Sequence, residues 1–375
     1  MKVLLVPDSF KGTLSSGAVA EAMARAVRDR FPGAEITSLS FADGGEGTVR
    51  AVLGAVPGKL RKSEVQNPWD EPVTAEWGVI EDGTRAVIEV AAASGLCLVP
   101  PEERRPLAAS TFGTGELVRE AIEEGIRRVL LGLGGSATVD CGAGLLQALG
   151  MRFLDAGGET VDVCGGNLAK VEALDDSRLI PELKETEILV ATDVDNLLLG
   201  PRGAAKVFGP QKGATPAEVH YLETGLTHFA NLLEESFEIN VGGFPGSGAA
   251  GGIAAGLRPF SRLSVVSGGK FLAGLMRLPE KMAAVDLVIT GEGRLDRQTL
   301  GGKAIKVIAD LGREAGKPVW AVVGGSEAGD EVKAALGLGQ VVDLTRVSGS
   351  KEEAMARPEH WIFLGLREAL ADFPG

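Results

Sequence analysis

The feature that most constrains this 375-residue chain is the stretch at residues 286–303, DLVITGEGRLDRQTLGGK. Its apolar run at 287–289 is typical of a fully buried strand. The run is expected to end at the glycine turn 291–293, and both signs of charge follow it before a helix. In open α/β sheets, ligands bind beyond the carboxyl ends of the strands. The stretch therefore indicates either a ligand-binding strand end or, as the alternative, a tight turn with a local ion pair.

Apolar runs that lead into acidic or glycine-rich loops recur along the chain, and each predicts a strand. They cover residues 3–6, 36–41, 129–131, 188–191 and 319–323. Helices are expected over residues 18–30, 116–124, 143–149, 216–233, 271–282 and 303–315. Alternation of strand and helix predicts a parallel sheet, whereas residues 73–79 and 86–90 alternate or cluster like antiparallel strands.

These patterns predict an α/β fold with two domains. Residues 1–65 and 261–375 are expected to form a doubly wound, Rossmann-like parallel-sheet domain. Residues 66–260 are expected to form a second, mixed α/β domain inserted into the first. Small-molecule sites occur preferentially between domains, so the active site is expected in the interdomain cleft.

Composition narrows the possible partners. The formal net charge of −13 argues against nucleic acid or an anionic membrane as a partner. Three cysteines are too few and too unpatterned for a disulfide framework or a zinc site. No apolar run has the length of a membrane span, and no signal peptide precedes the first strand. We therefore expect a soluble, cytoplasmic protein.

Several common chemistries fit the sequence poorly. None of the three histidines lies in a glycine-rich loop, and no nucleophile elbow occurs. The match to GxGxxG at residues 246–251 lacks the acidic residue that a dinucleotide site needs about 20 positions later. A Walker motif also fails, because Ala304 follows Gly302 and Lys303.

The ingredients of phosphoryl transfer are present in another arrangement. This reaction needs backbone N–H cradles, cations, carboxylates for Mg²⁺ and a group that deprotonates the attacking hydroxyl. Glycine loops at 44–47, 132–135 and 246–252 are candidate cradles. Taken singly, an acidic loop residue is more often a turn former or helix cap. Acidic residues recur at the strand exits of this chain, however, and this recurrence favours a role in phosphoryl transfer. The candidates are Asp8, Asp43, Asp140, Asp193, Asp195, Glu292 and Asp296.

Eight motifs, in one order over roughly the first 325 residues, resemble those of the type I glycerate kinases, the bacterial glycerate 2-kinases. They are VPDSFKGTLSS at the start, FADGGEGT at 41–48, STFGTGEL at 110–117, LGLGGSATVDCGAGLLQALG at 131–150, ATDVDN at 191–196, GPRGAAKVFGPQKGAT at 200–215, PGSGAAGG at 245–252 and DLVITGEGRLDRQTLGGKA at 286–304. The resemblance implies a two-domain fold with one Rossmann-like domain. It also implies ATP- and Mg²⁺-dependent phosphorylation of D-glycerate to 2-phosphoglycerate, with 3-phosphoglycerate less favoured. Leu197 replaces a usual proline, and residues 343–361 depart from the family's usual tail.

Site roles follow from the residues themselves. Asp193 is the predicted base, because it directly follows an apolar strand and lies beside Asp195 and Asn196. Lys11 and Asp8 complete the predicted catalytic set. Substrate binding is assigned to Ser9, Lys212, Arg294 and Asp43. ATP binding is assigned to Gly134, Gly135, Ser136, Gly291, Glu292 and Lys303, and Mg²⁺ binding to Asp296 and Asp195.

Two alternatives remain open. A kinase of the same family that acts on another small hydroxy acid, such as a tartronate- or tetronate-type acid, would carry the same cationic groups. A sugar-acid-binding regulator without turnover predicts missing carboxylates at the strand exits, and none is missing. Glycerate and ATP are the expected small-molecule partners, and the chain is expected to be a monomer or homodimer.

Overall fold

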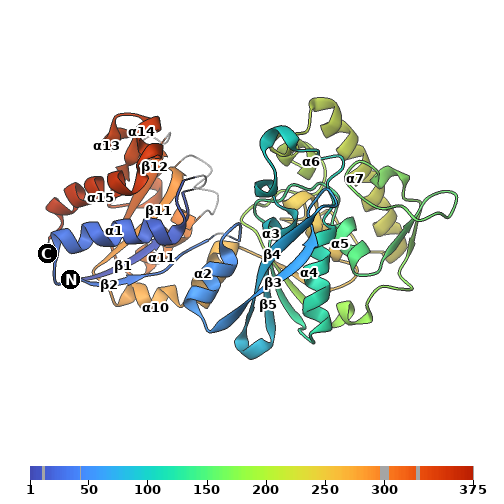
Figure 1. Cartoon of the computed structure of the whole chain (residues 1–375), viewed down its shortest axis with the longest axis horizontal. Coiled ribbons are helices and arrows are strands. Elements are labelled where there is room, and N and C mark those ends of the chain that lie inside the picture. The colour runs from blue at the N-terminus through green and yellow to red at the C-terminus, as the bar shows by residue number, and fades with distance from the viewer. Residues whose placement is uncertain (11–12, 43, 296–303, 327–329, 375) are drawn as a thin grey trace. The chain divides into compact units, whose positions relative to one another are not determined.

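The computed structural model describes residues 1–10, 13–42, 44–295, 304–326 and 330–374. The chain divides into two compact units, drawn with their elements in Figure 1. The first unit comprises Met1–Asp43, Arg50–Val56 and Gly269–Gly375, and the second comprises Gly44–Val49 and Pro57–Gly268. These units are defined by contacts. The boundaries near residues 66 and 261, which were predicted for folding domains, stay a prediction.

A five-stranded parallel sheet forms the centre of the first unit. Its spatial order is β13-β12-β11-β1-β2. In order along the chain this is the 2-1-3-4-5 doubly wound arrangement, which places the topological switch point between β1 and β11. The strands are β1 (Lys2–Pro7), β2 (Glu35–Ser38), β11 (Leu287–Leu295), β12 (Val319–Ser326) and β13 (Gln340–Asp343).

Helices cover both faces of this sheet. The four consecutive residues Val3, Leu4, Leu5 and Val6 of β1 are all fully buried, which is typical of a parallel strand covered on both sides. Helices α1 (Ser16–Arg30) and α15 (Pro358–Ala369) pack side by side over one core. Helix α11 (Ala304–Glu314) contacts β11 and β12. The remaining helices are α2 (Thr48–Ala55), α9 (Gly268–Leu275), α10 (Leu278–Ala283), α12 (Asp330–Leu336), α13 (Leu344–Ser348) and α14 (Lys351–Ala356).

Two strands run further than the sequence predicts. β11 was expected to end at the turn of Gly291, Glu292 and Gly293, and β12 at residue 323, and both predictions are wrong. The ladder continues, with Arg294 paired to Gly325 and Leu295 paired to Ser326. A Cβ at Gly324 would lie 2.5 Å from the carbonyl oxygen of Gly293, so glycine here permits close approach of the strands.

One predicted helix is interrupted. Residues 271–282 were expected to form a single helix, but α9 ends at Leu275 and α10 begins at Leu278. Arg277 adopts a left-handed conformation with φ of 53°. Pro279 then occupies the first turn of α10, where its missing N–H costs no helical hydrogen bond.

The second unit is built on a six-stranded mixed sheet with the order β10-β9-β6-β5-β4-β3. Strands β3, β4 and β5 are antiparallel neighbours, and the other pairs are parallel. The strands are β3 (Gly58–Gln66), β4 (Pro72–Ile80), β5 (Arg85–Glu89), β6 (Arg128–Gly132), β9 (Glu187–Ala191) and β10 (Arg262–Val266), beside a small hairpin of β7 (Arg152–Leu154) and β8 (Ala173–Asp175). The α/β prediction, with one parallel and one mixed sheet, is confirmed.

The helices of the second unit enclose its own apolar core. The longest, Pro216–Phe237 (α7), begins with a capping box between Thr215 and Glu218. The others are α3 (Val90–Ser94), α4 (Phe112–Glu123), α5 (Ala143–Ala148), α6 (Ala204–Phe208) and α8 (Ile253–Leu257). Among the described residues, we find no helix that combines the length and apolar character of a membrane span.

Candidate functional site

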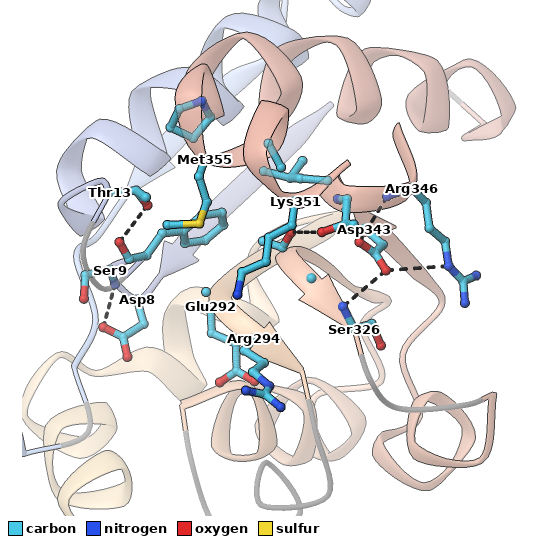
Figure 2. Close-up of a pocket in the computed structure, with 18 residues that line it drawn as sticks. Asp8, Ser9, Thr13, Glu292, Arg294, Ser326, Asp343, Arg346, Lys351 and Met355 are labelled. Atoms are coloured by element: carbon cyan, nitrogen blue, oxygen red, sulfur yellow. Dashed lines mark hydrogen bonds and ion pairs between the residues drawn. The ribbon is translucent and has the colours of Figure 1, made fainter. Parts of the chain in front are cut away.

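A cavity of about 680 Å³ lies at the carboxyl ends of β1, β11, β12 and β13 in the first unit (Figure 2). This position is the switch point of the doubly wound sheet, where ligands bind in open α/β folds. Four residues nominated from the sequence line this one cavity, namely Asp8, Ser9, Glu292 and Arg294.

The backbone holds the first two strand ends together. The N–H of Asp8 donates to the carbonyl oxygen of Gly291 at 2.9 Å, so this nominated glycine braces the cavity rather than lining it. The N–H of Ser9 donates to Oδ1 of Asp8 at 2.6 Å. Asp8 and Glu292 are 8% and 6% exposed. Two buried carboxylates therefore face one cavity from neighbouring strands.

A third wall comes from residues that sequence reasoning set aside. The buried carboxylate of Asp343 caps α13, accepting from the N–H of Thr345 at 2.9 Å, and also accepts from the N–H of Ser326 at 3.2 Å. Thr345 Oγ1 donates to the carbonyl oxygen of Gly324 at 2.9 Å. These contacts hold α13 at the end of β12, and α14 follows it along the cavity. The signal was present, because the apolar run ending at Asp343 repeats the pattern of the earlier strand exits.

The glycine loops of the second unit pack against each other. The N–H of Gly134 donates to the carbonyl oxygen of Gly44 at 3.1 Å. A Cβ at Gly132 would lie 2.5 Å from that same oxygen, and a Cβ at Gly134 would lie 2.5 Å from Cα of Gly45. These glycines therefore have a packing reason that is independent of any phosphate.

Glu89 anchors the loop at 44–49. Its carboxylate, at the end of β5, accepts from the N–H of Val49 at 2.6 Å and from that of Gly47 at 3.1 Å. Burial raises the pKa of Glu89, against the lowering effect of these two hydrogen bonds. Sequence reasoning did not single out this residue, although it ends an apolar strand as the nominated acids do.

Lys212 is buried inside the second unit, at 2% exposure. Its Nζ donates to Ser136 Oγ at 2.9 Å and to the carbonyl oxygen of Thr138 at 2.6 Å. Burial lowers the pKa of Lys212 to about 7, while the charge of Asp140 opposes that shift. Two nominated residues, Lys212 and Ser136, thus contact each other, and the amine braces the loop that follows β6.

Asp140 has a structural role. It is fully buried and accepts from the N–H and Oγ1 of Thr111 at 2.7 and 2.8 Å. The N–H groups of Gly142 and Gly144 also donate to it. Burial nevertheless raises the pKa of its carboxyl. The residue joins the start of α4 to the start of α5.

The predicted base and its neighbour lie beyond β9. Ser267 Oγ, which follows β10, donates to Asp193 Oδ1 at 2.6 Å. Asp195 instead forms an ion pair with Arg202 at 3.0 Å, and the two side chains are 74% and 76% exposed. Asp193 is therefore held just beyond the carboxyl end of β9, whereas the side chain of Asp195 is exposed to solvent.

The nominated residues fall into one group in each unit. The first contains Asp8, Ser9, Gly291, Glu292 and Arg294, and the second contains Gly134, Gly135, Ser136, Asp193, Asp195 and Lys212. Lys11, Asp43, Asp296 and Lys303 lie outside the described residues. Within the described ranges no three His, Cys, Asp or Glu side chains gather as a metal cluster. The site expected between the two domains remains a prediction.

Comparison with known proteins gives one consistent result. A family model described as the glycerate kinase family matches residues 3–371. The glycerate 2-kinase of Escherichia coli (strain K12) is 44% identical over 324 residues, 86% of this chain and 85% of that protein. A glycerate kinase of Halalkalibacterium halodurans is 41% identical over 353 residues, 94% of this chain and 93% of that protein. A crystal structure of a provisionally named glycerate kinase 2 from Salmonella typhimurium LT2 aligns with a TM-score of 0.82 and 39% identity, covering 99% of this chain and 97% of that one.

Proposed function

Because the chain belongs to the glycerate kinase family, we propose that it transfers the γ-phosphoryl group of ATP to D-glycerate and forms 2-phosphoglycerate. Membership makes the chain a phosphotransferase with an alcohol group as acceptor, and the kinase family implies ATP as the donor. The observation that carries the choice of product is the 44% identity to the Escherichia coli glycerate 2-kinase. We further propose that the enzyme acts in the cytoplasm, as a monomer or homodimer.

The reaction needs one proton acceptor and two anchored substrates. As the C2 hydroxyl oxygen of glycerate forms its bond to the γ-phosphorus, the bond from that phosphorus to the bridging oxygen breaks, and ADP leaves. Asp193 is the proposed base that takes the hydroxyl proton. The hydrogen bond from Ser267 Oγ to Oδ1 orients its carboxylate. Lys11, Asp43 and Lys212 are proposed to serve the acceptor, and Gly134, Gly135, Ser136 and Lys303 the donor.

The proposed Mg²⁺ would supply charge neutralisation at the β- and γ-phosphate oxygens. Of its two proposed ligands, Asp195 fits a metal site poorly, because Arg202 pairs with its Oδ1 and both side chains lie in solvent. Asp296 stays the proposed ligand. Mg²⁺ usually takes only one or two protein carboxylates beside phosphate oxygens and water, so one protein carboxylate is sufficient for the proposed site.

A substrate panel tests this function. ADP formation should be measured with D-glycerate, L-glycerate, tartronate and a tetronate-type acid, with and without EDTA. The product should be identified by ³¹P NMR. We expect D-glycerate to have the highest kcat/KM, the product to be 2-phosphoglycerate, and EDTA to abolish turnover. Another preferred acid would identify a same-family kinase of different specificity. Acid binding without any ADP formation would identify a regulator and overturn the proposal.

A further inference from the structure

We infer that the cavity of the first unit binds the nucleoside part of ATP, and that Met355 and Lys351 of α14 form the wall that selects it. This inference rests on the proposed kinase function. It assigns a ligand to one of the two groups of residues described above, and it gives a role to the tail at 343–361.

The cavity is too large and too apolar for a three-carbon hydroxy acid. Its volume of about 680 Å³ lies in the range of pockets that enclose larger organic ligands. The lining includes the apolar residues Phe10, Leu344, Ala354, Met355 and Pro358. Glycerate has almost no apolar surface to place there, whereas a nucleobase has two apolar faces.

Met355 is an exposed apolar residue that lines this cavity. Its 50% exposure is the highest among the exposed large hydrophobic residues described. Figure 2 shows this side chain extending into the cavity toward Ser9 and Thr13. A flexible thioether beside an open space is well suited to contact a flat ring. A bound base would therefore bury the apolar surface that Met355 now exposes.

The cavity also carries acceptors for hydroxyl groups. The buried carboxylates of Asp8 and Glu292 line it. Ribose hydroxyls donate hydrogen bonds to such groups, as they do in other doubly wound nucleotide sites.

Lys351 is placed to receive the phosphates. Among the described residues, its amine has no hydrogen bond or ion pair, and the side chain is exposed. Figure 2 shows it extending toward the side of the cavity that Glu292 and Arg294 line. The other two tail cations are paired, Arg346 with Asp343 at 3.6 Å and Arg357 with Glu353. Lys351 is therefore the tail cation available to a diphosphate.

The wall itself is anchored. Ser350 caps α14 by accepting from the N–H of Glu353 at 3.1 Å, and Ala354 is buried beneath the helix. Asp343 and Thr345 hold the preceding helix to β12. Exposed substitutions at 351 and 355 should therefore change the cavity surface without unfolding the unit.

Isothermal titration calorimetry of the full-length enzyme with ADP and with adenosine tests the inference. We expect Lys351→Met to weaken ADP binding by about tenfold or more and to leave adenosine binding within about twofold. Met355→Asp should weaken both ligands by about tenfold, because the base loses its apolar contact and meets a charge. Met355→Leu should retain both affinities. Lys184→Met, which removes an exposed lysine of the second unit, is the charge-matched control.

The outcomes separate this inference from the proposed function. If both variants bind ADP like the parent while the KM for D-glycerate rises, the cavity serves the acid and the inference is wrong, although the kinase function stands. If the parent enzyme neither binds ADP nor forms it, the proposed function fails together with the inference. Unchanged thermal midpoints of the variants establish that altered affinity is not a loss of fold.

Discussion

At the scale of single residues, the candidate site residues are of two kinds. Some stabilise the fold through buried hydrogen bonds, and others lie in a cavity or just beyond the end of a strand. Lys212 and Asp140 are enclosed by hydrogen-bond partners within the second unit. Asp193 accepts from Ser267 Oγ just beyond the end of β9. These environments lead to two different kinds of prediction.

Lys212 should make stability depend on pH. Its pKa falls from 10.5 to about 7 on folding, chiefly through burial. Between these pH values the unfolded chain binds more protons than the folded chain, so the free energy of unfolding rises with pH. Relative to Lys212→Met, the parent should gain up to about 1.4 kcal/mol per pH unit over this window. Urea unfolding of both proteins at several pH values measures the difference between their free energies of unfolding. Titration of other groups affects both proteins alike and cancels in this difference.

A difference between parent and Lys212→Met that stays constant from about pH 7 to pH 10 would contradict this prediction. It would mean that the amine keeps its proton in the folded state.

Asp193→Asn should lower kcat by at least about 10²-fold, the low end for a lost general base. The amide preserves the shape of the side chain and its acceptor for Ser267 Oγ, so ADP affinity should be retained. Steady-state kinetics and ADP titration measure both quantities. Asp176→Asn, at an exposed position of the same unit, is the matched control. A variant with near-parental kcat would remove Asp193 from the mechanism and direct the search to Asp296.

At the scale of elements, glycines in strands and helices have two kinds of surroundings. Some permit one loop to approach another, as Gly132 does beside the carbonyl oxygen of Gly44. Others have open space around them, as Gly17 does in the first turn of α1. The same residue type therefore predicts opposite responses to an added methyl group.

Gly132→Ala should destabilise the protein by about 1–3 kcal/mol, because the new Cβ forces backbone to move. Gly17→Ala should stabilise it by about 0.4–1 kcal/mol, because alanine restricts the unfolded chain at a helical position. Chemical denaturation of the two variants beside the parent measures both effects. Equal responses at the two positions would show that space around the glycine does not control the outcome.

At the scale of the whole molecule, the described residues of each unit include an apolar core of their own. The core of the first unit packs helices α1 and α15 against its parallel sheet, and that of the second unit includes residues of the mixed sheet and its helices. Cores that share no members need not unfold together.

We expect the two units to lose protection at different denaturant concentrations. Hydrogen exchange with mass spectrometry should report peptides from β1 and α1 separately from peptides of α4 and β6. ADP should raise the protection of the first unit, if its cavity holds the nucleoside. Simultaneous loss of protection in every peptide, with and without ADP, would contradict independent unfolding.

Local pattern was sufficient for much of this fold. The runs at 3–6, 188–191 and 319–323 lie in β1, β9 and β12, and the helix expected at 216–233 lies in α7. Ser15 caps α1, accepting from the N–H of Ala18 three positions later. These features depend on residues a few positions apart, which the sequence displays directly. The family motifs identified the reaction class because their long matches are specific.

Contacts between distant segments lay beyond such patterns. Thr290 Oγ1 donates to the carbonyl oxygen of Val6, which lies 284 positions away in the sequence. Lys212 Nζ donates to Ser136 Oγ, which lies 76 positions away. Pairing with β12 carries β11 past its glycines. The polar, exposed residues of β3 gave no strand signal, because an edge strand with two wet faces lacks apolar alternation. Residues of the tail line the cavity because Asp343 and Thr345 form hydrogen bonds with the end of β12. A local sequence pattern does not predict such a contact between separate segments.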